Sequence, residues 1–391
     1  MRIGIVAPEF PPDIGGVETY SFELARALAS RGHRVTVFTV PHPEGEITLP
    51  GIELMPILRQ RRRIDRAILN DYPMDVWHAT NAAYAWLAME VNNVVVSVHG
   101  NDFLRPYIDV GRPEIDRLPG LWRFASQLVG VDRHVGRWLT RRLVDQALPR
   151  VPHLLANSCY TQAALLRKYP ACRPRVTVGL VGVGQDFLDS THVARTPGEP
   201  ARLMTASRLS EPRKNVDVVL RALAALKDRF AFTYTVVGDG KLRPQLETLT
   251  RQLKLQDRVR FTGRLSTPAL RQHMASSDLF ILASSILPTS HEGFGIAYLE
   301  ANACGTPVLA ARLAGAIEAV SEGVSGMFVD VVSIPALQSA LTEFLAGKVP
   351  FRAEACREHA RQFGWDRVAD HVLSCYERVM LHFEDPTRVT H

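Results

Sequence analysis

Short runs of β-branched and other apolar residues alternate with segments of helical periodicity along most of the chain. The first periodic segment follows two glycines and places Val17, Tyr20, Leu24 and Leu28 on one face of a helix. Alternation of this kind predicts a parallel sheet covered by helices on both faces. In the first half we expect strands at 2–7, 34–40, 75–80, 94–100, 153–158 and 175–183, and helices at 113–128, 133–148 and 159–168.

A polar stretch at 189–201 interrupts this pattern, because it contains two prolines and a glycine and has no period. Such a composition is typical of a linker between domains. The alternation then begins again, with strands expected at 201–207, 232–238, 258–263, 278–284, 306–311 and 325–330, and helices at 215–229, 241–255 and 295–303. We therefore expect an α/β protein with two Rossmann-like domains, at 1–188 and 201–364, followed by a helical segment at 365–391.

Composition and charge narrow the class of protein. A chain of 391 residues is longer than a single hydrophobic core usually supports, which favours two domains. The net charge of +6 is spread evenly over the two halves, since residues 1–190 contain 22 basic and 19 acidic side chains. Neither half is therefore a nucleic-acid module. The five cysteines never form a CxxC pair, the first residues lack the pattern of a signal peptide, and the apolar run at 278–287 is too short to cross a bilayer. These features predict a cytoplasmic protein.

Ligands of open parallel sheets bind beyond the carboxyl ends of the strands, so the residues that follow each expected strand are candidates. Gly15 and Gly16 precede a helix and let the backbone approach a ligand, although a tight turn explains them equally well. His99 follows a buried-looking strand and is a functional candidate or a satisfied structural histidine. Asp102 either binds a ligand or caps the next turn.

Two further strand ends carry charge. Arg208 and Lys214 lie between an expected strand and the helix at 215–229, where they predict an anion-binding clamp, or alternatively a solvated basic loop. Glu300 interrupts an apolar helix, so its carboxylate should be offered hydrogen-bond donors, and a ribose diol is a good candidate. Glycines on either side of position 294 leave the start of that helix bare, while Glu292 precedes it in a loop that can accept hydrogen bonds from hydroxyl groups.

Glu292 and Glu300, with seven residues between them and GFGIAYLEANACGTPV around them, closely resemble the E-x7-E signature of retaining nucleotide-sugar glycosyltransferases of family 4. The resemblance covers nearly the whole chain, including the segments 11–39, 206–215, 236–247 and 363–379. It implies the GT-B fold, in which two Rossmann-like domains face a central cleft and the last helix crosses back onto the first domain. The second domain would bind the nucleotide sugar and the first domain the acceptor.

The resemblance also assigns roles to residues. It implies that Arg208 and Lys214 stabilise the departing diphosphate, that Glu292 lies near the donor sugar hydroxyls and that His99 faces the donor sugar. The residues that it implies for donor binding are Gly16, Gly238, Gly240, Leu265, Phe294, Gly295, Ile296 and Glu300, and those for the acceptor are Gly15 and Asp102. No Asp-x-Asp pair is present to hold a metal, so we expect metal-independent transfer without a cofactor. The resemblance implies that the anomeric configuration is retained and that the acceptor is a glycan, a lipid-linked molecule or a small molecule.

Other interpretations remain open from the sequence. One is a sugar-nucleotide epimerase of the same fold, and another is a non-catalytic nucleotide-sugar-binding protein; an NAD dehydrogenase is disfavoured because no GxGxxG motif is present in register. Two arginine-rich patches could touch an anionic acceptor or the inner face of a membrane, or could be solvated helix faces. They comprise Arg59, Arg61, Arg62, Arg63 and Arg66, and Arg133, Arg137, Arg141 and Arg142 beside Trp138. The oligomeric state, nucleotide base and sugar are not predicted.

Overall fold

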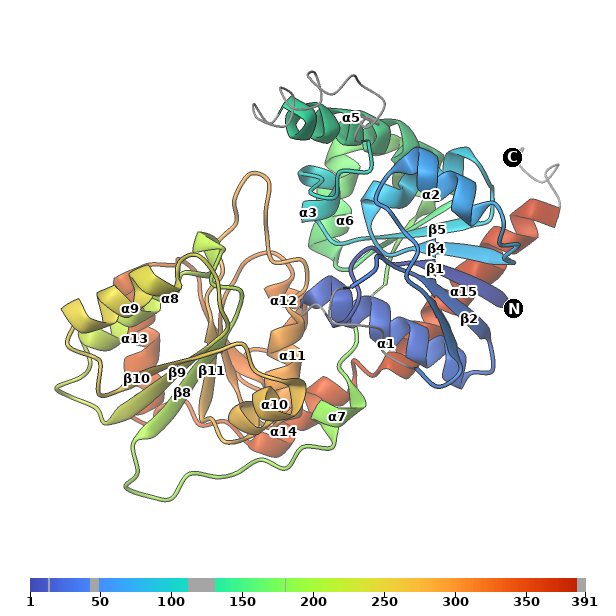
Figure 1. Ribbon diagram of the computed structural model, residues 1–391. Helices are drawn as coiled ribbons and strands as arrows, with labels where there is room; N and C mark the ends of the chain where they lie inside the picture. Colours follow the sequence, from blue (N-terminus) through green and yellow to red (C-terminus); the bar gives the residue numbers. More distant parts are fainter. Residues whose placement is uncertain (13–14, 43–48, 112–130, 180, 385–391) are drawn as a thin grey trace. The chain divides into compact units, whose positions relative to one another are not determined.

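The computed structural model describes residues 1–12, 15–42, 49–111, 131–179 and 181–384. The chain forms two compact units, of which one comprises Met1–Val181 with Trp365–His391 and the other Gly182–Gly364. Each unit contains one sheet whose described strand pairs are all parallel (Figure 1). The α/β class and the two Rossmann-like sheets predicted from the sequence are confirmed.

The first sheet has seven strands in the order β3-β2-β1-β4-β5-β6-β7. Its strands are β1 (Arg2–Val6), β2 (Arg34–Phe38), β3 (Ile52–Met55), β4 (Val76–Ala79), β5 (Val94–Val98), β6 (His153–Ala156) and β7 (Val176–Val178). The chain winds from β1 outward to β3 and then returns to β4, so the direction of winding reverses between β1 and β4. Ligands of doubly wound sheets bind at such a reversal.

Helices cover both faces of this sheet (Figure 1). One face carries α1 (Gly16–Ser30) and α15 (Trp365–Glu384), which contact each other. The opposite face carries α2 (Arg62–Leu69), the 3₁₀ segment η1 (Ala82–Met89), α3 (Asn101–Leu104), α5 (Val131–Ala147) and α6 (Cys159–Lys168). The expected helix at 113–128 lies outside the described residues.

A buried chain of hydrogen bonds fastens the last helix to the first sheet. The hydroxyl of Tyr376, on α15, lies 2.7 Å from Nδ1 of His78 on β4. Nε2 of His78 lies 2.7 Å from the Ser97 hydroxyl, which is also 2.8 Å from the hydroxyl of Tyr20 on α1. Because each of these side chains is buried, the polar groups satisfy one another where water is absent.

The second sheet has six strands in the order β10-β9-β8-β11-β12-β13. They are β8 (Ala201–Ala206), β9 (Phe232–Val237), β10 (Val259–Gly263), β11 (Leu279–Leu282), β12 (Val308–Ala311) and β13 (Gly326–Val329). The winding reverses between the neighbours β8 and β11, where Leu203 pairs with Leu279. The carboxyl ends of these two strands therefore mark the expected ligand position of this unit.

Helices also cover both faces of the second sheet. One face carries α8 (Val216–Ala224), α9 (Arg243–Gln252) and α13 (Ile334–Leu345). The other carries α10 (Thr267–Ala275), α11 (Ile296–Ala303), α12 (Ala316–Ala319) and α14 (Ala353–Arg361). Within the described residues, no helix is both long enough and apolar enough to span a bilayer.

The boundary between the units falls after Val181, ahead of the short helix α7 (Gln185–Leu188). Residues 191–196 have no regular secondary structure, and they lie against the second unit. The backbone N–H of Val193 donates to the Ala275 carbonyl at 2.8 Å, and Arg202 donates to the Val193 carbonyl at 2.8 Å. The stretch with linker composition is thus an extended segment held by the second unit.

Candidate functional site

A buried group of charges lies where the winding of the second sheet reverses. Lys214 lies in the loop after β8, and Glu292 lies in the loop after β11. Nζ of Lys214 donates a hydrogen bond to Oε2 of Glu292 at 2.6 Å. The same oxygen accepts hydrogen bonds from Nη1 of Arg213 at 3.2 Å and from the Ser284 hydroxyl at 2.9 Å. The sequence placed Lys214 and Glu292 at two strand ends, and the fold brings them into contact.

The local backbone explains how these side chains meet. Pro212–Lys214 form a 3₁₀ turn, η5, after which Asn215 adopts a left-handed conformation (φ 54°) that asparagine tolerates better than most residues. The Asn215 amide then donates to the Ala283 carbonyl at 2.7 Å and lies 2.8 Å from the Ser285 hydroxyl. Asn215 therefore ties the loop after β8 to the loop after β11.

The charge on Glu292 is held in its ionised form. Burial alone would raise the pKa of this carboxyl, but the positive charges of Lys214 and Arg213, with hydrogen bonds from Lys214 and Ser284, outweigh burial and lower the pKa to about 2. The carboxylate thus remains negative at neutral pH and fixes both cations at the strand ends.

Arg208 extends this group of charges toward the solvent. Its side chain is 60% exposed, and its Nε lies 3.4 Å from Oε1 of Glu211. The other Glu211 oxygen is 2.7 Å from Nη2 of Arg213, whose side chain is almost completely buried. Three cations therefore share two carboxylates, and the cluster keeps one net positive charge, which favours an anionic ligand.

The predicted glycine loop after β9 packs directly on the loop that carries Arg208. Gly238 has φ 124°, and a Cβ atom there would lie 2.0 Å from the Ser207 carbonyl oxygen, so no other residue fits. A Cβ at Gly240 would meet the backbone of Leu209 and the Ser210 side chain. Leu265 follows β10 and is partly buried. These residues lie at the same carboxyl edge of the sheet as the charged cluster.

Helix α11 begins at this edge. Gly295, its N-cap, has φ 95°, and a Cβ there would lie 2.3 Å from the ring of Tyr298. Ile296 and Glu300 are partly exposed and share one helix face, because they are four residues apart. The side chain of Phe294 is buried, with its ring 5.8 Å from that of Phe363, so only its backbone remains to serve a ligand.

In the first unit, the structure places His99 and Asp102 together after β5. The His99 ring donates from Nε2 to the Thr80 carbonyl at 3.1 Å, which leaves Nδ1 as an acceptor, and burial lowers the pKa of this histidine. The buried Asp102 carboxylate accepts three backbone hydrogen bonds at 3.0–3.1 Å, from the N–H groups of Ala82, His99 and Phe103. This pattern corresponds to the capping alternative that the sequence left open for Asp102.

The predicted glycine pair lies at the start of α1. Gly15 is the N-cap in an extended conformation (φ 178°), and Gly16 is the first helical residue. A Cβ at Gly15 would lie 2.3 Å from Oε2 of Glu18, but that atom ends a flexible side chain that can move, so neither packing nor backbone strain requires glycine there. The glycines, His99 and Asp102 all lie at the carboxyl edge of the first sheet, whereas the remaining predicted site residues belong to the second unit.

Reasoning from sequence missed three residues of the charged cluster: Arg213, Ser284 and Asn215. Arg213 stood beside Lys214 in the same basic loop, but nothing in the sequence distinguished the buried arginine from the exposed Arg208. Ser284 and Asn215 are ordinary loop residues. Ser284 reaches Glu292 within the loop after β11, whereas the pairing of β8 with β11 brings Asn215 to Ala283. Their positions next to strand ends were the one signal available.

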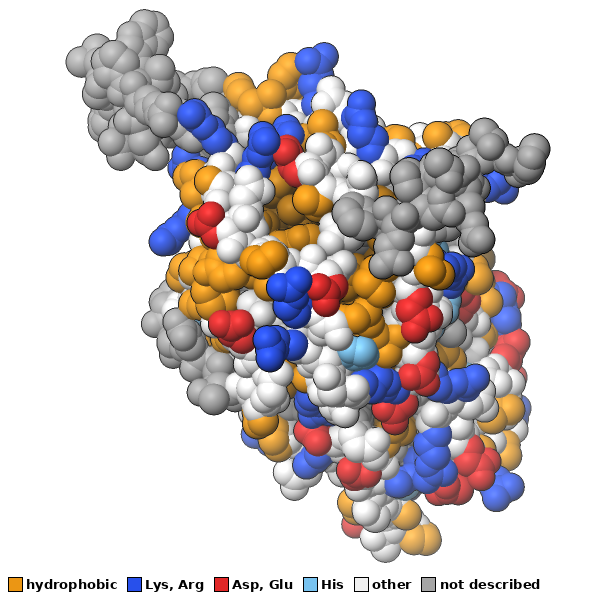
Figure 2. Space-filling model, turned by 90° about the vertical axis from the view of Figure 1, so that its right-hand side faces the viewer, with side chains coloured by type: hydrophobic (Ala, Val, Ile, Leu, Met, Phe, Trp, Pro, Cys, Tyr) orange, Lys and Arg blue, Asp and Glu red, His pale blue; other side chains and the backbone are white. Residues whose placement is uncertain are grey.

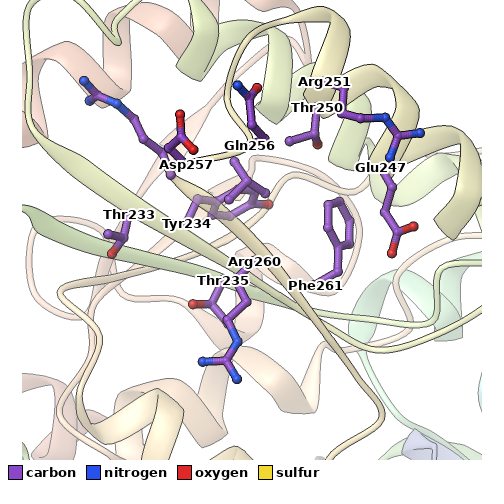
Figure 3. A pocket seen from close by; sticks show the side chains of 12 residues that line it. Thr233, Tyr234, Thr235, Glu247, Thr250, Arg251, Gln256, Asp257, Arg260 and Phe261 are labelled. Atoms are coloured by element: carbon purple, nitrogen blue, oxygen red, sulfur yellow. The ribbon is translucent and has the colours of Figure 1, made fainter.

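A groove of about 620 Å³ lies elsewhere in the second unit, along the edge strand β10. Figure 3 shows its lining side chains, which come from β9, β10, α9 and the turn that follows α9. Thr233, Glu247, Arg251, Asp257 and Arg260 are among them. None of the predicted site residues lines this groove, so the charged cluster remains the candidate site.

The two arginine-rich patches make different contacts among the described residues. In the first patch, Arg62 and Arg66 both pair with Glu90, at 3.0 and 2.9 Å. On α5, Trp138 is 52% exposed and the Arg142 guanidinium stacks 4.2 Å from the centre of its ring. The side chain of Arg133 lies outside the described residues. Figure 2 shows basic and acidic side chains interspersed with apolar ones over the face that it displays.

Two family models match most of the chain. The model of the family described as Glycosyltransferase Family 4 matches residues 14–183, and that of Glycosyl transferases group 1 matches residues 191–363. A D-inositol 3-phosphate glycosyltransferase 2 of Catenulispora acidiphila is 29% identical over 94% of this chain and 90% of its own length. A GDP-mannose-dependent alpha-(1-6)-phosphatidylinositol monomannoside mannosyltransferase of Mycobacterium tuberculosis is 27% identical over 94% of this chain and 96% of its own length.

Solved structures share the fold. The sucrose-phosphate synthase of Thermosynechococcus elongatus superposes with a TM-score of 0.75 at 18% identity, over 97% of this chain and 99% of the other. The Anabaena protein HepE, in complex with UDP, superposes with a TM-score of 0.70 at 18% identity, over 97% of this chain and 100% of HepE. The resemblance stated from the E-x7-E segment is thereby confirmed. The chain belongs to the family 4 glycosyltransferases and has their GT-B fold.

Proposed function

We propose that this glycosyltransferase moves a sugar from a nucleoside diphosphate donor to a hydroxyl acceptor, with retention of the anomeric configuration and without a metal ion. The observation that carries the proposal is the charged cluster at the winding reversal of the second sheet, where Lys214 is fixed by Glu292. The names of two proteins similar to this chain point to such donors, since one is GDP-mannose-dependent and the other was solved with UDP.

The cluster supplies what the reaction needs. When the glycosidic bond to the donor phosphate breaks, negative charge grows on the diphosphate, so positive groups aimed at it stabilise the transition state more than the ground state. We assign this role to Arg208 and Lys214. Arg213 and Glu292 position Lys214, and Glu292 accepts hydrogen bonds from sugar hydroxyls with its remaining capacity. Because these cations are part of the protein, we propose that no metal ion is required.

The other predicted residues take roles around this centre. Glu300 accepts hydrogen bonds from the ribose, while Gly238, Gly240 and Leu265 shape the nucleotide position. Backbone N–H groups at Phe294, Gly295 and Ile296, at the start of α11, bind oxygens of the donor. In the first unit, His99 contacts the donor sugar, Gly15 and Gly16 admit substrate near the backbone, and Asp102 holds His99 in place through its backbone.

Retention without a protein nucleophile follows the family pattern, in which the acceptor hydroxyl attacks from the face that the diphosphate leaves. The departing phosphate oxygen then accepts the proton of that hydroxyl.

We further propose peripheral contact with anionic membrane lipids through α5, because Trp138 and Arg142 form an exposed aromatic and cationic pair. The relative of Mycobacterium tuberculosis is named for a phosphatidylinositol-based acceptor, which agrees with a membrane location.

The decisive experiment offers UDP-, GDP-, ADP- and TDP-sugars to the purified chain and measures slow donor hydrolysis, which requires no acceptor. We expect one nucleotide series to be hydrolysed, with equal rates in EDTA and in added Mg²⁺. Conversion of a UDP-sugar to its epimer would instead support the epimerase alternative. Binding of a nucleotide sugar without turnover, even with acceptors present, would support the non-catalytic alternative.

A further inference from the structure

A second cluster of polar side chains lies where the winding of the first sheet reverses. Glu9 follows β1, and Asn81 follows the neighbouring β4. The Asn81 amide donates to Oε2 of Glu9 at 2.8 Å, and the Tyr107 hydroxyl lies 3.0 and 2.8 Å from the two Glu9 oxygens. Glu18, on the first turn of α1, completes what we call the Glu9 cluster: Glu9, Glu18, Asn81 and Tyr107.

One carboxylate oxygen of the cluster, Oε2 of Glu18, is not accounted for by the fold. Glu18 is only 7% exposed, and within the described part of the chain its Oε2 has no hydrogen-bond partner. Burial and the nearby negative charge of Glu18 raise the pKa of Glu9 to about 7, against hydrogen bonds from Tyr107 and Asn81. Leaving a buried carboxylate oxygen without a donor costs free energy, which a ligand that donates hydrogen bonds would recover.

A ligand can reach Glu9 and Tyr107, and the chemistry of the cluster selects the class of ligand. Tyr107 is 47% exposed and Glu9 is half-buried. Carboxylates accept hydrogen bonds from hydroxyl groups, and a tyrosine hydroxyl both donates and accepts. None of the hydrogen bonds described for these four side chains comes from a lysine or an arginine. A phosphate group held by these four side chains would therefore meet two carboxyl groups and no lysine or arginine.

We propose that the Glu9 cluster is the acceptor site and binds the hydroxyl groups of an uncharged sugar or polyol ring. This inference rests on the proposed function, and it specifies that the ring carrying the attacked hydroxyl has no phosphate of its own. It distinguishes this chain from the relative named for D-inositol 3-phosphate. A phosphate elsewhere in a longer acceptor would lie away from the cluster.

The test measures acceptor binding to the full chain without donor, by saturation-transfer NMR. The uncharged probes are myo-inositol, methyl α-mannoside and methyl α-glucoside. Each is compared with its monophosphate, namely D-inositol 3-phosphate, methyl α-mannoside 6-phosphate and methyl α-glucoside 6-phosphate. We expect at least one uncharged probe to bind, and at least fivefold more tightly than its phosphate. Tighter binding of the phosphates, or no binding of any uncharged probe at about 20 mM, would overturn the proposal.

Variants locate the binding. Glu9→Gln and Tyr107→Phe should each weaken binding of the uncharged probe at least fivefold, while Glu53→Gln, at an exposed carboxylate on β3, should leave it unchanged. Tyr107→Phe removes only one hydroxyl from a half-exposed ring, so this variant should fold. It therefore still tests the binding site if Glu9→Gln does not fold. Unchanged binding in the folded variants would contradict the assignment. Donor hydrolysis by the unaltered chain is measured separately, so failure of the proposed function remains distinguishable.

Discussion

Nζ of Lys214 lies 2.6 Å from Oε2 of Glu292, which joins a cation after β8 to a carboxylate 78 residues later, after β11. The two strands are neighbours at the winding reversal of the second sheet. The contact therefore arises from topology, because parallel strands that diverge in their connections leave their carboxyl ends open to a ligand.

The clamp is tested by removing its cations one at a time. Lys214→Ala and Arg208→Ala should each lower donor hydrolysis about 100-fold, because the loss of a preorganised charge removes transition-state stabilisation. Arg221→Ala on α8 and Lys348→Ala are matched controls at exposed positions, and they should keep full activity. Circular dichroism should show all four variants folded. Near-normal hydrolysis in both clamp variants would refute the clamp.

Replacement of Glu292 should reveal itself in the pH dependence of stability. The pKa of Glu292 is about 2 in the folded protein and near its ordinary value of 4.5 in the unfolded chain. The unfolded chain therefore takes up a proton first as the pH falls, so the stabilisation from this group is complete above about pH 4.5 and is lost toward pH 2.

Glu292→Gln should accordingly cost about 3 kcal/mol at pH 7, since it leaves buried cations with less compensation. Urea unfolding from pH 7 to pH 3 measures the difference from the unaltered protein, which should shrink below pH 5. Glu343→Gln, at an exposed position on α13, is the control and should show no such trend. A Glu292→Gln deficit that stays constant down to pH 3 would contradict the ion-pair explanation.

Much of this site could be predicted because strand ends are visible in a sequence. Runs such as 201–207 and 278–284 locate β8 and β11 within a few residues, and their alternation with helices predicts a parallel sheet. The residues after each strand must then share one edge. The sequence predicts Lys214 and Glu292 by this argument, together with the family resemblance.

What the sequence could not indicate is which way each side chain turns. Arg208 and Arg213 are both basic loop residues, yet the η5 turn buries Arg213 while Arg208 remains exposed. Asp102 was equally compatible with a ligand and a cap until three backbone donors appeared around it. The edge strand β3 was not predicted, because Glu53 interrupts its short apolar run, and none of its four residues is buried. These outcomes depend on contacts distant in the chain.

Glycine at position 238 is required by close packing, and a substitution there tests the loop contact. Gly238→Ala places a Cβ 2.0 Å from the Ser207 carbonyl oxygen, so the loop that carries Arg208 must shift. We expect at least a tenfold loss of donor hydrolysis and a destabilisation of about 2 kcal/mol or more. Gly323→Ala is the matched control, because Gly323 also has positive φ but has open space around it.

In that control only the backbone strain of about 1 kcal/mol should appear, with normal hydrolysis. Thermal unfolding and the hydrolysis assay measure the two effects on the same samples. If Gly238→Ala behaved like Gly323→Ala in both assays, the packing of the glycine loop on the Arg208 loop would have no part in the site.

Membrane contact through α5 can be separated from donor hydrolysis, because Trp138 and Arg142 lie on a different unit from the charged cluster. Sedimentation with vesicles containing about 30% anionic lipid should deplete the protein, whereas neutral vesicles should not, since cationic and aromatic side chains favour anionic interfaces. Trp138→Ala combined with Arg142→Ala should lower the bound fraction at least threefold, whereas Arg221→Ala should not.

Because screening by salt weakens surface attraction, 0.5 M NaCl should release most of the bound protein. Equal and negligible sedimentation with anionic and neutral vesicles would show that α5 presents an ordinary solvated face, and the acceptor would then have to reach the protein from solution.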